Sequence, residues 1–122
     1  MTISARAAED LLPLRPVVLQ VLLSLADGER HGYAIVQDIA DRSTARLQLE
    51  PGNLYRHLKF MLDEGLIEES DRRPVPGKDD ERRRYYRLTR FGRQVALAEA
   101  TRLQTLAAEA RARLLSRSQG RS

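Results

Sequence analysis

The regular pattern of the chain begins with a segment that is apolar on nearly every side. Between Pro16 and Ala26, seven of eleven residues are Val or Leu. Proline is well tolerated in the first turn of a helix, and a helix that lacks a polar face is normally buried. We therefore expect residues 16–26 to form the central buried helix, followed by a turn at residues 27–30 around Gly28.

A second helical pattern covers residues 32–42. Its expected inner face has apolar side chains three or four positions apart, namely Tyr33, Val36, Ile39 and Ala40. His31 stands just before this helix, where its side chain is placed to cap a free backbone N–H group. Residues 43–50 alternate at Leu47 and Leu49, which is enough for a very short edge strand and no more.

The third segment, residues 50–67, has the clearest two-sided pattern. Pro51 suits a helix start and Gly65 a helix stop. One face of this helix is apolar and consists of Leu54, Leu58, Met61 and Leu62. The opposite face is mostly polar and cationic, and consists of Gly52, Asn53, Arg56, Lys59, Phe60 and Asp63. Such a helix suits a DNA major groove, but the pattern alone equally fits an ordinary solvated amphipathic helix.

Two short β-type segments follow, at residues 66–70 and 83–88, on either side of a loop rich in Pro and Gly. In the second strand, Tyr86 and Leu88 share one face, and Tyr85 and Arg87 the other. Three helices followed by a basic hairpin are the element order of a winged helix-turn-helix domain. The predicted fold is therefore mainly α with a small β-hairpin, although an arginine-rich hairpin tip is also compatible with a role in solubility alone.

A long last helix is expected from Arg90 to Ser116, capped by Thr89. Small and apolar residues follow a heptad pattern along it, at Ala96, Ala100, Leu103, Ala107, Ala110 and Leu114, with Leu106 beside them. At about 1.5 Å per residue this helix would be roughly 40 Å long, more than one small domain covers. We expect it to be a dimerisation helix; the alternative is that it folds back on its own domain.

The predicted organisation is thus one domain with extensions. Residues 1–12 form a partly ordered N-terminal arm, residues 13–89 the winged helix-turn-helix domain, residues 90–116 the C-terminal dimerisation helix, and residues 117–122 a disordered tail. No apolar run approaches the ~18 residues that span a membrane, and the first residues do not have the pattern of a signal peptide. We expect a cytoplasmic protein without a membrane partner.

Charge and composition reduce the range of functions that are compatible with the sequence. The 122 residues carry a net charge of +4, yet residues 72–93 alone carry nine basic and three acidic residues, a net charge of +6. A local cationic segment favours a polyanionic partner, first of all nucleic acid. Cysteine is absent and the two histidines, His31 and His57, are far apart in the sequence, which argues against a metal site. No nucleophile–base pair is visible, so we expect neither an enzyme nor a cofactor.

Five blocks carry a family resemblance. They are residues 31–35 (His-Gly-Tyr-Ala-Ile), 52–58 (Gly-Asn-Leu-Tyr-Arg-His-Leu), 64–67 (Glu-Gly-Leu-Ile), 84–89 (Arg-Tyr-Tyr-Arg-Leu-Thr) and 92–93 (Gly-Arg). In order and spacing the chain resembles the PadR family of bacterial transcriptional regulators, in particular the smaller subfamily with a single C-terminal helix. The resemblance implies a homodimer that binds a palindromic operator, usually represses transcription, and is released by a small hydrophobic effector.

The residues then divide into two predicted sites. For double-stranded DNA, Asn53 and Arg56 are expected to contact base edges and Tyr55 and Lys59 to contact phosphates. Four wing residues, Arg73, Lys78, Arg82 and Arg83, are expected to add affinity that does not depend on base sequence. The seam of the last helix is expected to join the two protomers. The alternative function is a winged-helix module that binds a ligand or another protein and does not recognise DNA.

Overall fold

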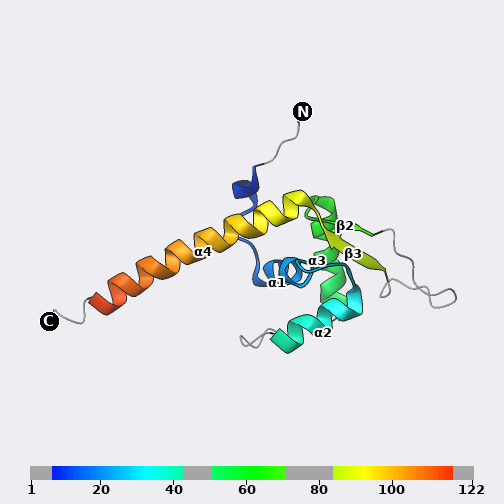
Figure 1. The fold of residues 1–122 in the computed structure, drawn as a ribbon, viewed down its shortest axis with the longest axis horizontal. Helices are drawn as coiled ribbons and strands as arrows, with labels where there is room; N and C mark the ends of the chain where they lie inside the picture. The colour runs from blue at the N-terminus through cyan, green and yellow to red at the C-terminus, as the bar shows by residue number, and fades with distance from the viewer. Residues whose placement is uncertain (1–6, 43–50, 71–83, 117–122) are drawn as a thin grey trace.

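The computed structural model describes residues 7–42, 51–70 and 84–116. In chain order these contain η1 (Ala8–Leu11), α1 (Pro16–Ser24), β1 (Arg30–His31), α2 (Gly32–Arg42), α3 (Pro51–Asp63), β2 (Ile67–Glu69), β3 (Tyr85–Leu88) and α4 (Arg90–Ser116). Figure 1 shows α1, α2, α3 and the small sheet gathered beside the N-terminal part of α4, whose other end runs away from them. The predicted fold class, mainly α with a small sheet and a long last helix, is confirmed.

The hydrophobic core lies between the inner faces of α1, α2 and α3, and is closed by the sheet and the start of α4. On α3 the predicted apolar face is correct, because Leu54, Leu58 and Met61 are fully buried and Leu62 is partly buried. Gly65 follows with a φ of +78°, the left-handed conformation that favours glycine at a helix end. The other buried apolar residues are Val18, Val21, Leu22, Leu25, Ile35, Ile39, Leu66, Ile67, Tyr86 and Val95.

The inner face expected for α2 was only partly correct: Ile39 is buried and Val36 is partly buried against the core, as predicted. Tyr33 is 58% exposed and Ala40 is also exposed, whereas Ile35 and Ile39 are buried. At about 100° per residue, a face centred on Ile35 and Ile39 turns Tyr33 roughly 200° away from Ile35, which leaves the tyrosine outside the core. Helix α1 was expected to be buried on nearly every side, but its Leu23 is 44% exposed.

The sheet has three antiparallel strands in the order β1-β3-β2. The hairpin was predicted, but a strand at residues 30–31 was not. Residue Arg30, expected in a turn, pairs with Tyr86, and His31 pairs with Tyr85. Strand β1 thus pairs with the edge of β3 that β2 leaves unpaired. On the other side Glu68 lies opposite Arg87, whose Nε donates to Glu68 Oε2 at 2.7 Å. The predicted hairpin strands are confirmed as β2 and β3.

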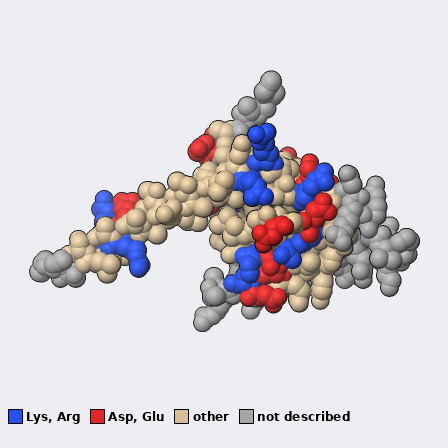
Figure 2. Space-filling view, viewed as in Figure 1, with Lys and Arg blue, Asp and Glu red and all other residues tan. Residues whose placement is uncertain are grey.

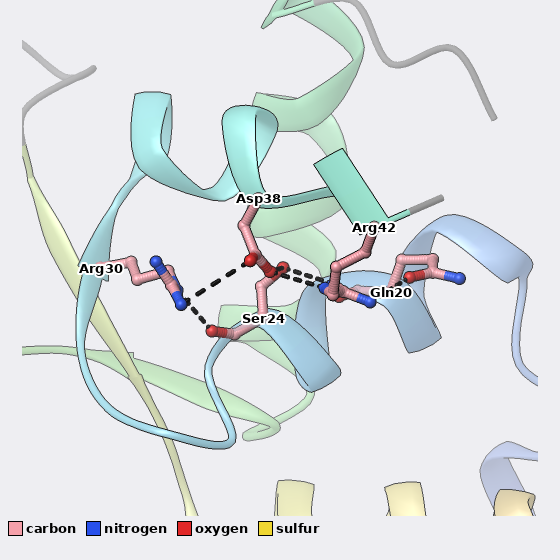
Figure 3. Close-up of polar contacts among 5 residues, drawn as sticks. All are labelled: Gln20, Ser24, Arg30, Asp38 and Arg42. Carbon is pink, nitrogen blue, oxygen red and sulfur yellow. Dashed lines mark hydrogen bonds and ion pairs between the residues drawn. The ribbon is translucent and has the colours of Figure 1, made fainter. Parts of the chain in front are cut away.

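A polar network joins α1 to α2 beside the core (Figure 3). The Asp38 carboxylate accepts hydrogen bonds of 2.8 Å from the buried Ser24 hydroxyl and from Arg42 Nε. Arg42 also donates to the Gln20 side chain at 2.8 Å, and Arg30 Nε donates to the Ser24 carbonyl at 2.7 Å. Burial alone would raise the pKa of Asp38, but the hydrogen bonds from Arg42 and Ser24 outweigh it and lower that pKa. The network therefore fixes the angle between α1 and α2 with a carboxylate that stays charged.

The helix α4 is attached to the domain only along its first part. Thr89 caps it as predicted, because the Gly92 N–H donates to the Thr89 hydroxyl at 2.9 Å. Glu99 is 2% exposed and accepts a hydrogen bond from the Leu14 N–H at 3.1 Å, which ties the segment before α1 to α4. From residue 103 to residue 116 every side chain except Ala110 is exposed. The folded-back alternative therefore does not describe this part of the helix.

Several predictions concern residues outside the described ranges. They are the first half of the N-terminal arm, the short edge strand at residues 43–50, the wing residues between positions 71 and 83, and the tail at residues 117–122.

Candidate nucleic-acid interface

The outer face of α3 carries the donors that the sequence predicted. Asn53, Arg56 and Lys59 are all exposed, on the side opposite the buried leucines. The Arg56 guanidinium donates a hydrogen bond to the Asn53 side-chain oxygen, one helical turn away. Lys59 Nζ lies 3.4 Å from Asp63 Oδ2, with both side chains largely solvated. Because neither pair is buried, both are weak, and the donors are available to a polyanion that approaches this face.

Tyr55 lies differently from the other three predicted residues. It is partly buried and packs against the hydrophobic core. A Cβ at position 32 would lie only 2.9 Å from its hydroxyl oxygen, so the tyrosine ring rests directly against Gly32 at the start of α2. This contact explains why a small residue follows His31 in the sequence. Whatever Tyr55 contacts outside the protein, its ring also holds α3 against α2.

The base of the hairpin contains arginines that are already paired. Arg84 Nη1 lies 2.9 Å from Glu69 Oε2, and Arg87 lies 2.7 Å from Glu68 Oε2 and 3.7 Å from Glu29 Oε2. These cations thus bind glutamates of β2 and of the segment before β1, and part of the net +6 charge is balanced within the fold. The four wing residues predicted to contact DNA, Arg73, Lys78, Arg82 and Arg83, lie outside the described ranges.

A cavity of about 500 Å³ adjoins the other edge of α3. Two arginines and a histidine line it, namely Arg15, which precedes α1, and Arg56 and His57 of α3. Burial, together with the charges of Arg15 and Arg56, lowers the pKa of His57. Sequence reasoning missed this cluster, because Arg15 and His57 are more than forty positions apart in the chain. The cavity places Arg56 on two surfaces, the outer face of α3 and the cavity wall.

The predicted dimerisation seam on α4 is largely exposed. Ala96 is partly buried against the core of its own domain, whereas Ala100, Leu103, Leu106, Ala107 and Leu114 are exposed and Ala110 is intermediate. Residues 103–108 contain no charged side chain. Figure 2 shows this uncharged stretch between the domain and the charged side chains near the far end of α4. Most of the predicted seam is therefore open to solvent in the single chain.

A comparison with known protein families identifies the class of protein to which this chain belongs. Residues 21–98 match the family described as the transcriptional regulator PadR-like family, which is more than half of the chain. The chain belongs to the PadR-like family. The expected family is thereby confirmed, and with it the expectation that the protein is a transcriptional regulator and not an enzyme. A comparison with curated proteins gave no significant match.

Solved structures of PadR-like proteins share the fold. A PadR family regulator from Clostridium difficile superposes with a TM-score of 0.65 at 22% identity, covering 81% of this chain and 97% of that one. One from Eggerthella lenta gives 0.65 at 25% identity, covering 88% and 84%. Bacillus subtilis PadR, solved in complex with operator DNA, gives 0.59 at 28% identity, covering 70% of this chain and 47% of that one. The PadR-like chain thus spans about half the length of the Bacillus protein.

Two further observations limit the chemistry of the site. Within residues 7–42, 51–70 and 84–116, no group of three or more His, Asp or Glu side chains is arranged to hold a metal ion. None of the helices in the same ranges is both long and apolar enough to cross a membrane.

Proposed function

We propose that this PadR-like regulator binds double-stranded DNA through the outer face of α3. The observation that carries the proposal is that Asn53, Arg56 and Lys59 are exposed together on a helix whose opposite face is fully packed. A rigid helix with outward donors is the element that winged-helix proteins place in a major groove. The likeness to a PadR protein solved with operator DNA supports the same assignment.

The side chains divide into two roles. A side-chain amide suits the paired donor and acceptor of adenine, and a guanidinium suits the two acceptors of guanine, so Asn53 and Arg56 are the proposed base contacts. Because these two side chains are hydrogen-bonded to each other in the free protein, they must separate to bind bases. Tyr55 and Lys59 are the proposed phosphate contacts, together with the wing residues Arg73, Lys78, Arg82 and Arg83.

A homodimer is the second part of the proposal. The exposed Ala and Leu seam of α4 is the surface through which two protomers would join, because an uncovered apolar stripe of this length is costly in water. A two-fold dimer places two α3 helices on one side of the duplex, which requires a palindromic operator. We propose repression as the outcome, with release by a small hydrophobic effector that changes the spacing of the two helices.

Selection of bound sequences from a random duplex pool tests this function. The expected result is an enriched palindrome whose half-sites are about one helical turn apart.

Arg56→Ala should relax base preference at one position of each half-site. The matched control is Arg111→Ala, which removes an exposed arginine near the far end of α4. Lys78→Ala should instead weaken binding to every sequence and reduce its salt dependence. Failure to retain any duplex at low salt would refute DNA binding and favour the ligand- or protein-binding alternative.

A further inference from the structure

Glu99 is a buried charge that joins α4 to the N-terminal segment. It is 2% exposed, and among the residues that the structure describes no other charged side chain is buried. Its Oε2 accepts the Leu14 N–H at 3.1 Å. Arg102, one turn further along α4, donates from Nε to Oε1 at 2.6 Å and from Nη2 to Oε2 at 2.9 Å. Because hydrogen bonds to an ionised group are strong and directional, the carboxylate is held in one position.

This contact lies where α4 leaves the domain. In front of it, η1 packs against α4 (Figure 1), and Leu11 and Leu14 are partly buried against the core. Beyond Arg102, the side chains of residues 103–116 are exposed except for Ala110, which is intermediate. In the described part of the chain, Glu99 and Arg102 therefore mark the last turn of α4 that packs against its own domain.

Two attachments determine the direction of α4. The first is at Gly92, where an added Cβ would lie 2.0 Å from the Leu66 carbonyl oxygen, and the second is at Glu99. At about 1.5 Å per residue, Glu99 lies about 10 Å and Leu114 about 33 Å from Gly92 along the helix. With Gly92 as the pivot, a shift of about 1 Å at Glu99 would move Leu114 by about 3 Å. The position of Glu99 therefore has a large effect on the exposed part of the helix.

An apolar residue at position 99 would attach α4 less specifically. Burial of apolar surface is non-directional, so a helix can tilt slightly over an apolar surface at little cost. A buried carboxylate that moves loses its hydrogen bonds, and a buried charge without a partner is costly. The hydrogen bonds from Arg102 outweigh burial and lower the pKa of Glu99, so the carboxylate stays charged at neutral pH. The chemistry at this position thus favours a single orientation of α4.

We propose that Glu99 is a positioning residue that determines which spacing of operator half-sites the dimer accepts. It acts through α4. By holding this helix against the segment before α1, Glu99 fixes the angle between each DNA-binding domain and the seam through which the protomers join. The two α3 helices are then held at one separation and one relative rotation. This inference rests on the proposed DNA binding and the proposed homodimer, and it assigns the residue that controls their geometry.

Pulsed electron paramagnetic resonance of the full chain measures this geometry without DNA. The sequence has no cysteine, so Gln37→Cys, at an exposed position of α2, provides one spin-labelling site in each protomer. The distance between the two labels should have one narrow distribution when position 99 is glutamate. Glu99→Leu removes both acceptor oxygens and should broaden the distribution about twofold or more, because small shifts at this position are amplified along α4.

Two further variants grade this result. Glu99→Gln keeps an acceptor for the Leu14 N–H but not the charge, so the width of its distance distribution should be intermediate. Glu109→Gln changes an exposed glutamate of α4 that pairs with Arg113 on the same helix. This matched control should leave the distribution unchanged.

Operators with altered spacers test the consequence for DNA binding. Insertion of two base pairs between the selected half-sites rotates one of them by about 70° and moves it by about 7 Å. A rigid dimer should bind this duplex about tenfold or more weakly than the selected operator, because it loses one of its two contacts. Glu99→Leu should reduce the difference to about threefold or less, since a tilting α4 lets both α3 helices reach their half-sites. Binding to a duplex with a single half-site should be the same for both proteins, which separates positioning from a loss of folding.

Equal distribution widths with Glu99 and with Glu99→Leu would overturn this inference alone, as would a spacer preference that Glu99→Leu leaves unchanged. If Glu99→Leu does not fold, Glu99→Gln decides by the same two measurements. Absence of any distance between labels would refute the homodimer, and failure of the wild type to retain duplex at low salt would refute DNA binding. Either of these last two results would overturn the proposed function together with this inference.

Discussion

Gly92 occupies the closest approach between α4 and the rest of the domain. A Cβ at this position would lie 2.0 Å from the carbonyl oxygen of Leu66 and 2.9 Å from its carbonyl carbon. Nonbonded carbon contacts require about 3.5 Å, so Gly92→Ala would force the backbones apart by roughly 1 Å or more. Because Leu66 is fully buried between α3 and β2, the strain would reach the element that carries the proposed DNA-binding face.

The expected cost follows from the contacts at this junction. The Leu66 carbonyl accepts the Thr89 N–H at 3.2 Å, and the Thr89 hydroxyl lies 3.0 Å from it and caps α4. Loss of about two hydrogen bonds at ~1 kcal/mol each, with overpacking of about 1–3 kcal/mol, exceeds the ~1 kcal/mol that alanine contributes as a better helix former. Gly92→Ala should therefore destabilise the fold by about 2–4 kcal/mol, equivalent to a Tm decrease of roughly 8–16 °C.

Thermal and urea unfolding, followed by circular dichroism at one fixed protein concentration, measure this effect. Gly65→Ala is the matched control, because nothing lies within 4 Å of its added Cβ and only the positive φ of +78° opposes it. Its cost should be about 1–2 kcal/mol. A Gly92→Ala protein as stable as the wild type, or more stable than Gly65→Ala, would show that α4 does not lie against Leu66 as described.

Three further predictions concern polar contacts and the seam. Glu99→Gln should destabilise the fold by about 1–3 kcal/mol at neutral pH. Hydrogen bonds from Arg102 outweigh desolvation and lower the pKa of Glu99, so the stabilisation by its carboxylate is present above the ordinary carboxyl pKa and is lost as the pH falls through the lowered folded-state pKa. In urea unfolding from pH 7 to pH 3, the stability difference between wild type and Glu99→Gln should therefore shrink. Arg42→Met should cost about 1–3 kcal/mol in the same assay, because it leaves Asp38 and Ser24 without their shared donor. Leu103→Glu should give a monomer in sedimentation equilibrium while Leu97→Glu, exposed on α4 outside the seam, stays dimeric; an unchanged Leu103→Glu dimer would mean that the seam is wrongly assigned.

Features that depend on neighbouring residues were predictable from the sequence. The bounds of α4, the buried face of α3, the Thr89 cap and the stop at Gly65 all follow from helical period and terminal chemistry, which act within one or two turns. His31 illustrates the same point, because its Nδ1 accepts the Ala34 N–H at 3.1 Å as a local cap. The exposed donors of α3 were predictable for the same reason, since the buried leucines determine which side faces outward.

Other features were decided only by tertiary packing. Strand β1 is two residues long and exists because β3 offers it a free edge, which no local pattern at Arg30 reports. Burial of Ile35 instead of Tyr33 depends on what packs against α2, and burial of Glu99 depends on a partner 85 positions away at Leu14. The cavity that joins Arg15, Arg56 and His57 arises in the same way. Sequence periodicity specifies which face of a segment is apolar, whereas the partners of a buried charge depend on how distant segments are placed in three dimensions.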